Sequence, residues 1–155
     1  MEVSSSEFWI VIGVAILCGG LVGLERQFRS KPVGIRTSIL VCLGTSIFII
    51  LGRQFTGDNV DATRVLGQVV TGIGFLGAGV IIAREGLITG VTTASVIWVL
   101  AGIGAMIGFE YYLEALIIAG VTVSVLTGIE LLESRVSRLQ ERYRPPGDEV
   151  RGYDE

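Results

Sequence analysis

The sequence predicts an all-α membrane protein, a bundle of five transmembrane helices with the N-terminus outside and the C-terminus in the cytoplasm. Half of the 155 residues are hydrophobic and only 17% are charged, whereas soluble domains carry roughly 25% charged residues. The mean hydropathy is +0.67. Apolar runs recur along the chain, and the charged residues gather in the short segments between them.

Each helix of this bundle follows from the hydropathy of the chain. Five runs with few or no charges are the expected spans: residues 8–24, 37–52, 65–83, 91–109 and 111–132. Their lengths are close to the roughly 20 apolar residues that cross a bilayer as a helix. The acidic leader before the first run differs from the basic start of a cleavable signal peptide, so we expect this run to be a span.

The distribution of Lys and Arg predicts the orientation. With the N-terminus outside, two of the 12 basic residues, Arg53 and Arg64, face outward, and the other 10 face the cytoplasm. The reverse orientation would violate the positive-inside rule. We therefore expect the loops before the second and fourth spans, and the C-terminal segment, on the cytoplasmic side.

The segment after the last span has two parts. Residues 133–144 place apolar side chains at helical spacing on one face and Arg and Glu on the other, which is typical of an amphipathic helix at a membrane surface. Residues 145–155 begin with two prolines and are polar and acidic, which is typical of disorder. We expect a membrane domain over 1–132, an amphipathic cytoplasmic helix over 133–144 and a disordered tail over 145–155.

The third run contains Gly72-x-Gly74-x-x-Gly77, which formally matches the dinucleotide-binding fingerprint. That fingerprint needs a strand before it and a helix after it, for which an apolar run of this length has no room. Small residues let membrane helices approach closely, so we expect the third span at the centre of the bundle. The expected packing residues are Gly19, Gly23, Gly72, Gly74, Gly77, Ala78 and Gly79. Two interpretations stay open for these faces: packing within the chain, or contact in a homodimer.

Polar residues on the predicted cytoplasmic side form a candidate inner polar site. Its members are Glu25, Arg26, Arg36, Glu85, Thr92 and Thr93. Arg36 is the expected ion-pair partner of Glu25. One interpretation is a set of interfacial anchors, with threonine hydroxyls bonded to carbonyls of the preceding turn. The other is a polar cavity open to the cytoplasm.

A candidate outer cluster comprises Asp61, Arg64 and Gln68. Asp61 suits the N-cap of the third helix, and a glutamine in lipid needs partners, so its face is expected to point inward. Asp58 and Asp61 are the weak candidates for a loose outward cation site, but two carboxylates supply fewer oxygen ligands than a hard cation wants, so no metal site is predicted. Between the inner and outer sites, the glycine-rich block is expected to pack closely and to insulate one from the other.

No set of reactive groups is visible in the sequence. The chain has no His, and its two cysteines, Cys18 and Cys42, lack the spacing of a metal site or a disulfide framework. Both cysteines are expected to be small apolar packing residues. We therefore expect no enzyme, no catalytic residue, no cofactor and no nucleic-acid partner.

Three segments carry motifs in a specific order: GGLVGLERQFRSKPVGIRTSILVCLGTSIF, DATRVLGQVVTGIGFLGAGVII and GVTTASVIWVLAGIGAMIG. Over about residues 10–130 the chain resembles the membrane domain of the MgtC/SapB family. The resemblance marks as motif positions Glu25, Arg26, Arg36, Asp61, Arg64, Gln68, the block from Gly72 to Gly79, Thr92, Thr93 and Ala94. Many members have a cytoplasmic ACT-like domain after the last span, and a role of that domain is not expected of these 155 residues.

The resemblance implies a multi-pass protein of the prokaryotic cytoplasmic (inner) membrane that is not an enzyme. It implies a modulator of other membrane machinery, including the F-type ATP synthase, in adaptation to low magnesium or intracellular stress. The implied partners are membrane lipid, ATP synthase subunits or small membrane peptides. The alternative function is a divalent cation transporter or channel for magnesium. Transport paths usually contain carboxylates near the membrane midplane, and the predicted spans have none there.

Overall fold

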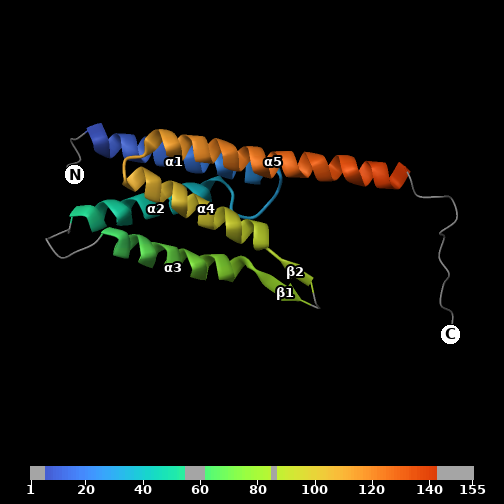
Figure 1. The fold of residues 1–155 in the computed structure, drawn as a ribbon, viewed down its shortest axis with the longest axis horizontal. Helices are drawn as coiled ribbons and strands as arrows, with labels where there is room; N and C mark the ends of the chain where they lie inside the picture. Colours follow the sequence, from blue (N-terminus) through green and yellow to red (C-terminus); the bar gives the residue numbers. More distant parts are fainter. Residues whose placement is uncertain (1–5, 55–61, 85–86, 143–155) are drawn as a thin grey trace. The chain divides into compact units, whose positions relative to one another are not determined.

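In the computed structural model, which describes residues 6–54, 62–84 and 87–142, the described chain consists of helices and one short hairpin (Figure 1). The helices are α1 (Ser6–Phe28), α2 (Ile35–Gln54), α3 (Ala62–Val80), α4 (Val91–Gly108) and α5 (Tyr112–Arg142). The strands are β1 (Ile82–Arg84) and β2 (Leu87–Thr89). The chain divides into two compact units, Met1–Val123 and Ser124–Glu155.

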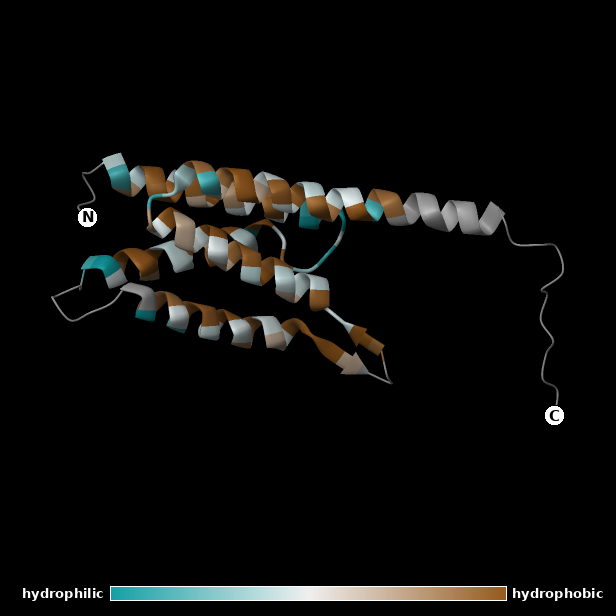
Figure 2. Cartoon of the chain, in the orientation of Figure 1, coloured by the Kyte–Doolittle hydropathy of each residue, from teal (hydrophilic) through white to brown (hydrophobic). Residues whose placement is uncertain are grey.

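Within the described residues, four helical segments are long and apolar enough to cross a membrane: Ser6–Phe28, Ile35–Gln54, Val91–Gly108 and Tyr112–Leu132. The third helix has a shorter apolar stretch, Arg64–Val80, near the lower limit of about 17 residues for a span. Hydrophobic residues cover most of each helix in the first unit, and hydrophilic ones gather near helix ends and in loops (Figure 2). The predicted all-α, multi-pass membrane fold is therefore confirmed.

Close packing of α1 on α2 depends on two glycines. A Cβ atom added to Gly19 would lie 2.7 Å from the Cα of Ile39, and one added to Gly23 would lie 2.6 Å from the Cα of Ile35. Real side chains do not approach a backbone this closely, so only glycine fits at these two positions. The predicted packing role of Gly19 and Gly23 agrees with this geometry.

The fourth helix packs on α2 in the same way. A Cβ added to Gly104 would lie 2.5 Å from the carbonyl oxygen of Cys42, and one added to Gly108 would lie 2.6 Å from the Cβ of Ile49. The Cys42 thiol also donates to the Leu100 carbonyl at 3.4 Å. Fully buried side chains fill the space among α1, α2 and α4: Cys18, Val22, Cys42, Ile49, Leu100, Ile103 and Ile107. The second helix therefore lies at the centre of the core, and both cysteines are buried packing residues.

The third helix lies at the edge of this unit, beside α2 and α4 (Figure 1). Added Cβ atoms at Gly67, Gly72, Gly74 and Gly79 would meet nothing within 4 Å. Ala78 is exposed. At Gly77 the nearest atom is the Cβ of Ala94 at 3.7 Å, which is ordinary van der Waals contact. The expectation that this glycine-rich helix forms the centre of the bundle is wrong, because α2 takes that place.

A two-stranded hairpin connects α3 to α4. The third helix ends at Val80, and β1 pairs with β2 in antiparallel register, Ile82 opposite Thr89 and Arg84 opposite Leu87. The third span was predicted to extend to residue 83. Its last three residues, 81–83, are not helical, so this part of the prediction is wrong. Gly90 follows the hairpin with a φ of 90°, and an added Cβ would collide with the Val80 carbonyl oxygen. Only glycine satisfies both constraints at this junction.

The last helix continues past the predicted span. The segment Tyr112–Arg142 is one helix, which includes most of the stretch predicted to be an amphipathic cytoplasmic helix. In its first turns Ala115 and Ala119 are fully buried. The predicted disordered tail, residues 145–155, lies outside the described residues.

Candidate functional site

A buried arginine joins three parts of the chain at one end of the first unit. We call this end the inner end, because the sequence predicts that it faces the cytoplasm. Arg26, in the last turn of α1, is only 4% exposed. Its Nη2 donates to Thr93 Oγ1 at 3.1 Å, and its Nε donates to the Pro32 carbonyl at 3.4 Å. A guanidinium has five N–H donors and can satisfy several acceptors at once. Arg26 therefore links α1, the loop before α2 and the first turns of α4.

The loop between α1 and α2 is held in an uncommon conformation. Ser30 and Val33 have positive φ angles of 54° and 63°, which a β-branched residue such as valine rarely adopts. The Lys31 amide donates to the Arg26 carbonyl at 2.9 Å, and the Ser38 hydroxyl donates to the Val33 carbonyl at 3.3 Å. These bonds hold the strained turn and so position the Pro32 carbonyl for Arg26.

Glu25 forms its ion pair within α1 rather than across the loop. Its Oε1 lies 2.8 Å from Nε of Arg29, and the Glu25 side chain is only 8% exposed. The expected partner Arg36 is exposed, so the predicted Glu25–Arg36 pair is wrong. The other carboxylate oxygen of Glu25 is buried without a hydrogen-bond partner among the described residues. Leaving a buried acceptor unpaired is costly, so a further donor at this point would be stabilising.

The threonine pair at the start of α4 is divided between two environments. Thr93 is buried and accepts from Arg26, whereas Thr92 is exposed. The expectation that both threonines line one site is therefore wrong for Thr92, because successive residues of a helix point about 100° apart. Glu85, the remaining predicted member of the inner site, lies outside the described residues.

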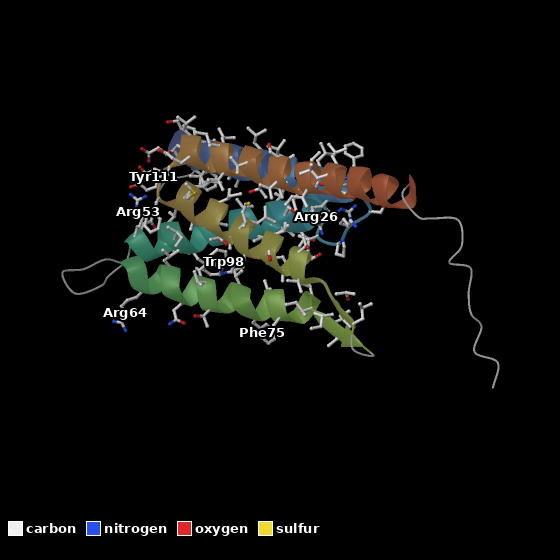
Figure 3. All side chains as sticks on the ribbon, turned by 45° about the vertical axis from the view of Figure 1, so that its right-hand side comes forward. Arg26, Arg53, Arg64, Phe75, Trp98 and Tyr111 are labelled. Carbon is white, nitrogen blue, oxygen red and sulfur yellow. The ribbon has the colours of Figure 1, made fainter. Side chains whose placement is uncertain are left out.

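The opposite end, which we call the outer end, has an ion pair that was not predicted from the sequence. Nη1 of Arg53 lies 2.7 Å from Oε1 of Glu110 and donates to the Gly108 carbonyl at 3.0 Å. A cavity of about 260 Å³ adjoins this pair and is also lined by Glu7 and Tyr112. Figure 3 shows Arg53 and Arg26 at the two ends of the first unit. The available signal was that Arg53 and Glu110 each directly follow an apolar run on the same predicted side.

The predicted outer cluster is not assembled as expected. Arg64 and Gln68 are both exposed, so the face that carries them does not point into the core. Gln68 instead lines a groove between α2 and α3. Asp58 and Asp61, which were considered as metal ligands, lie outside the described residues. Within the described ranges, no group of three or more His, Cys, Asp or Glu side chains could hold a metal ion.

Two apolar grooves flank α3. One, of about 550 Å³, lies between α2 and α3 and extends from Thr37 to Phe48 along α2. The other, of about 440 Å³, lies between α3 and α4 and includes Gly74, Ala78 and Trp98. Both grooves are lined mostly by apolar residues, and Gly72 lines one and Gly74 the other. That the glycine block insulates the two ends from each other stays a prediction. Fully buried side chains between α2 and α4 also lie between the two ends.

Comparison with known proteins identifies relatives. The MgtC family model matches residues 12–135. YhiD of Escherichia coli (strain K12), named as a candidate magnesium transporter, is 41% identical over 115 residues, which are 70% of this chain and 54% of YhiD. Protein MgtC of Salmonella typhimurium (strain LT2) is 39% identical over 128 residues, 82% of this chain and 53% of that protein. Protein MgtC of Brucella abortus (strain 2308) is 44% identical over 94 residues, 61% of this chain and 39% of that protein.

The chain thus spans about half the length, or less, of these curated relatives. No solved structure matches it significantly. The family match covers the helices that form both polar ends and both grooves. By its sequence and its bundle of apolar helices, this chain belongs to the MgtC family.

Proposed function

We propose that this chain is a non-enzymatic modulator of other membrane machinery, acting in magnesium homeostasis at the prokaryotic inner membrane. It acts by binding partner membrane proteins through the face shared by α3 and α4. This α3–α4 face consists of Gly74, Ala78, Ser95 and Trp98, with the residues of the groove between them. The F-type ATP synthase, which the family resemblance implies, is the first partner to test, and small membrane peptides and a second copy of the chain are the next.

The observation that carries this proposal is the openness of the α3–α4 face. Gly74 has no described atom within 4 Å of an added Cβ, and Ala78 and Ser95 are exposed. In lipid, helices associate where small residues let backbones approach. The core of the same unit uses its glycines in this way, at Gly23 and Gly104, so a small-residue face without a partner in the chain fits an incoming helix.

A large aromatic residue borders the same face. Trp98 is 58% exposed and lines the groove beside Gly74 and Ala78. Tryptophan is enriched among the residues that dominate binding energy at protein interfaces. Small residues next to an exposed indole suit the binding of a partner helix. The partner helix would pack its own small residues against Gly74 and Ala78 and an apolar side chain against the Trp98 ring.

Magnesium transport is the alternative function, and the name of YhiD favours it. Mg²⁺ keeps several waters and binds through carboxylates, and intramembrane ion paths usually expose ionisable groups. The apolar runs of α1, α2, α3 and α4 have no acidic residue. Between the two polar ends the core is filled by Leu100, Ile103 and Ile49, each no more than 1% exposed. These features favour the modulator over a conducting path.

The first experiment measures whether the α3–α4 face is needed in cells. A strain lacking this gene is complemented for growth in low magnesium with the wild-type chain or with Gly74→Leu. The leucine has space in the isolated chain, so we expect a normal protein level and melting temperature but loss of complementation. Gly13→Leu is the matched control, because Gly13 on α1 also has nothing within 4 Å. Equal growth of both variants would refute the assigned face.

The second experiment separates the modulator from the transporter. Purified protein is reconstituted in liposomes that contain a magnesium-sensitive dye. We expect flux no faster than that of empty liposomes. Flux above that level that is reduced by Asp61→Ala would favour the transporter instead.

A further inference from the structure

We propose that the groove between α2 and α3 binds one acyl chain of an anionic phospholipid, with the lipid phosphate held by Arg36 and Lys31 at the inner end. This α2–α3 groove is separate from the α3–α4 face. Its lining is almost entirely apolar along its length: Leu40, Val41, Gly44, Phe48, Val65, Val69, Gly72, Ile73 and Leu76, with Thr37, Thr45 and Gln68 as the polar members.

Missing side chains create the space in the groove. Gly44 on α2 and Gly72 on α3 both line it, and neither would bring an added Cβ within 4 Å of another atom. The two helices meet again at the outer end, where an added Cβ on Gly52 would lie 2.7 Å from Cγ2 of Val65. The groove is therefore closed at its outer end and open along the rest, with a volume of about 550 Å³.

The length of the groove fits a lipid chain better than a transmembrane helix. From Thr37 to Phe48 along α2 the helical rise is about 16 Å. One leaflet contributes about 15 Å, half of a hydrocarbon core of roughly 30 Å. An acyl chain anchored at the inner surface would fill the groove and end there, whereas a helix from another subunit would extend across both leaflets.

Polar residues stand where the headgroup of such a lipid would lie. Arg36 and Thr37 form the start of α2, and Lys31 lies in the preceding loop; all three are exposed. Arg36 is one helical turn before Leu40, which lines the groove, so the two share a face of α2. The nearby carboxylate of Glu25 is paired with Arg29, which leaves a cationic rim suited to a phosphate.

The opposite end of the groove has one exposed cation, Arg64, against two at the inner end, and it is the end that Gly52 and Val65 close. Gln68 is the polar group there, and it lies one turn inward from Val65 on α3. An amide marks the end of the apolar lining but has no charge for a phosphate. The charge asymmetry therefore assigns the headgroup to the end with Arg36, which the positive-inside distribution places in the cytoplasmic leaflet.

The experiment uses lipids with brominated acyl chains, which quench tryptophan fluorescence on contact. The reporter is Phe48→Trp in a background with both natural tryptophans replaced, Trp9→Phe and Trp98→Phe, reconstituted in vesicles. Brominated phosphatidylglycerol is compared with brominated phosphatidylcholine at equal mole fraction. We expect the anionic lipid to bind several-fold more tightly at the reporter, with a loss of about fivefold for each cation removed in Arg36→Gln and Lys31→Gln.

Two variants test the geometry. Arg64→Gln removes an exposed cation at the outer end and should leave the lipid preference unchanged. Gly44→Leu fills open space, so it should preserve the melting temperature while reducing quenching by both lipids. Equal quenching by the two lipids, or quenching unaffected by Gly44→Leu, would overturn the proposal. If quenching of the reporter by both lipids falls as the protein density in the vesicle rises, a second copy of the chain occupies the groove. That result would also overturn the proposal.

Discussion

The glycines of the α1–α2–α4 core and those of α3 have similar sequence patterns but opposite surroundings. In the core, Gly19, Gly23, Gly104 and Gly108 each leave no room for a Cβ atom against the backbone or a Cβ of α2. In α3, Gly67, Gly72, Gly74 and Gly79 face open space. The core glycines bring helices of one chain together, and those of α3 leave a surface available to lipid or to another protein.

A pattern of small residues therefore makes close packing possible but does not determine which helix is the partner. Each of the two sets includes glycines at helical spacing on an apolar helix. What separates them is the second helix, which offers its backbone to α1 at Ile35 and Ile39 and to α4 at Cys42. A membrane helix has no hydrophobic drive to associate in lipid, so such shape matches decide which helices are neighbours.

The largest effect should come from filling a core glycine with a large side chain. Gly23→Leu would drive its side chain into the backbone of α2 at Ile35, which an added Cβ would already approach to 2.6 Å. Overpacking costs about 1–3 kcal/mol and occasionally more, and here a backbone must move. We expect little monodisperse protein by size-exclusion chromatography in detergent. Gly13→Leu on the same helix is the control, and comparable yields of the two variants would contradict the packing of α1 on α2.

The next effect concerns the junction that places α3 at the edge. Gly90→Ala would force a left-handed conformation on alanine, at a cost of roughly 1–2 kcal/mol, and would press its Cβ on the Val80 carbonyl. We expect a clear fall in melting temperature. Gly102→Ala in α4, where an added Cβ meets nothing within 4 Å, should melt like the wild type. If the two alanines behave alike, the hairpin geometry described here is not the one in solution.

A smaller effect should come from the link between α1 and α4 at the inner end. Arg26 and Thr93 are both buried, and the hydrogen bond that joins them is 3.1 Å long. Hydrogen bonds that involve a charged group contribute about 1.5–3 kcal/mol. We expect a coupling of this order in a double-mutant cycle of Arg26→Gln and Thr93→Val, measured by thermal unfolding. Additive effects of the two changes would show that the pair is not coupled.

The smallest effect should come from the outer-end ion pair. Arg53 and Glu110 have side chains 38% and 58% exposed, and exposed pairs contribute about 0.2–1 kcal/mol. We therefore expect Glu110→Gln to lower the melting temperature slightly at low salt and hardly at all at high salt, where charges are screened. A large, salt-independent loss would mean that this pair is part of the packed core.

The sequence was sufficient to predict the parts of the fold that depend on hydropathy. Apolar runs predicted the helices, and the small residues Gly19 and Gly23 predicted a close contact of α1. The edge position of α3 was not predictable, because Gly74 and Gly104 belong to similar small-residue patterns and only three-dimensional neighbours distinguish them. The hairpin had a signal, a Gly86-containing connection between two short apolar segments, which the apolar character of the run concealed.

The candidate sites were less predictable than the fold. The predicted positions of the span boundaries placed Arg26 and Thr93 at the same membrane depth. This grouping is correct, because the two side chains are hydrogen-bonded. Rotation about the helix axis was not predictable from one sequence, so Thr92 was grouped with its buried neighbour and Arg36 was paired with Glu25. Ion pairs one helical turn apart, such as Glu25 with Arg29, compete with pairs across a loop, and here the pair within the helix forms.

The most direct test of the central contrast is an alanine scan of both glycine sets in detergent. A single methyl group is added at Gly19, Gly23, Gly104 and Gly108 in the core, and at Gly67, Gly72, Gly74 and Gly79 in α3, and the melting temperature of each variant is measured. We expect a marked decrease at every core position and no decrease at the α3 positions, where alanine also favours the helix. Equal decreases in both sets would show that α3 is packed as tightly as the core and would contradict its position at the edge of the unit.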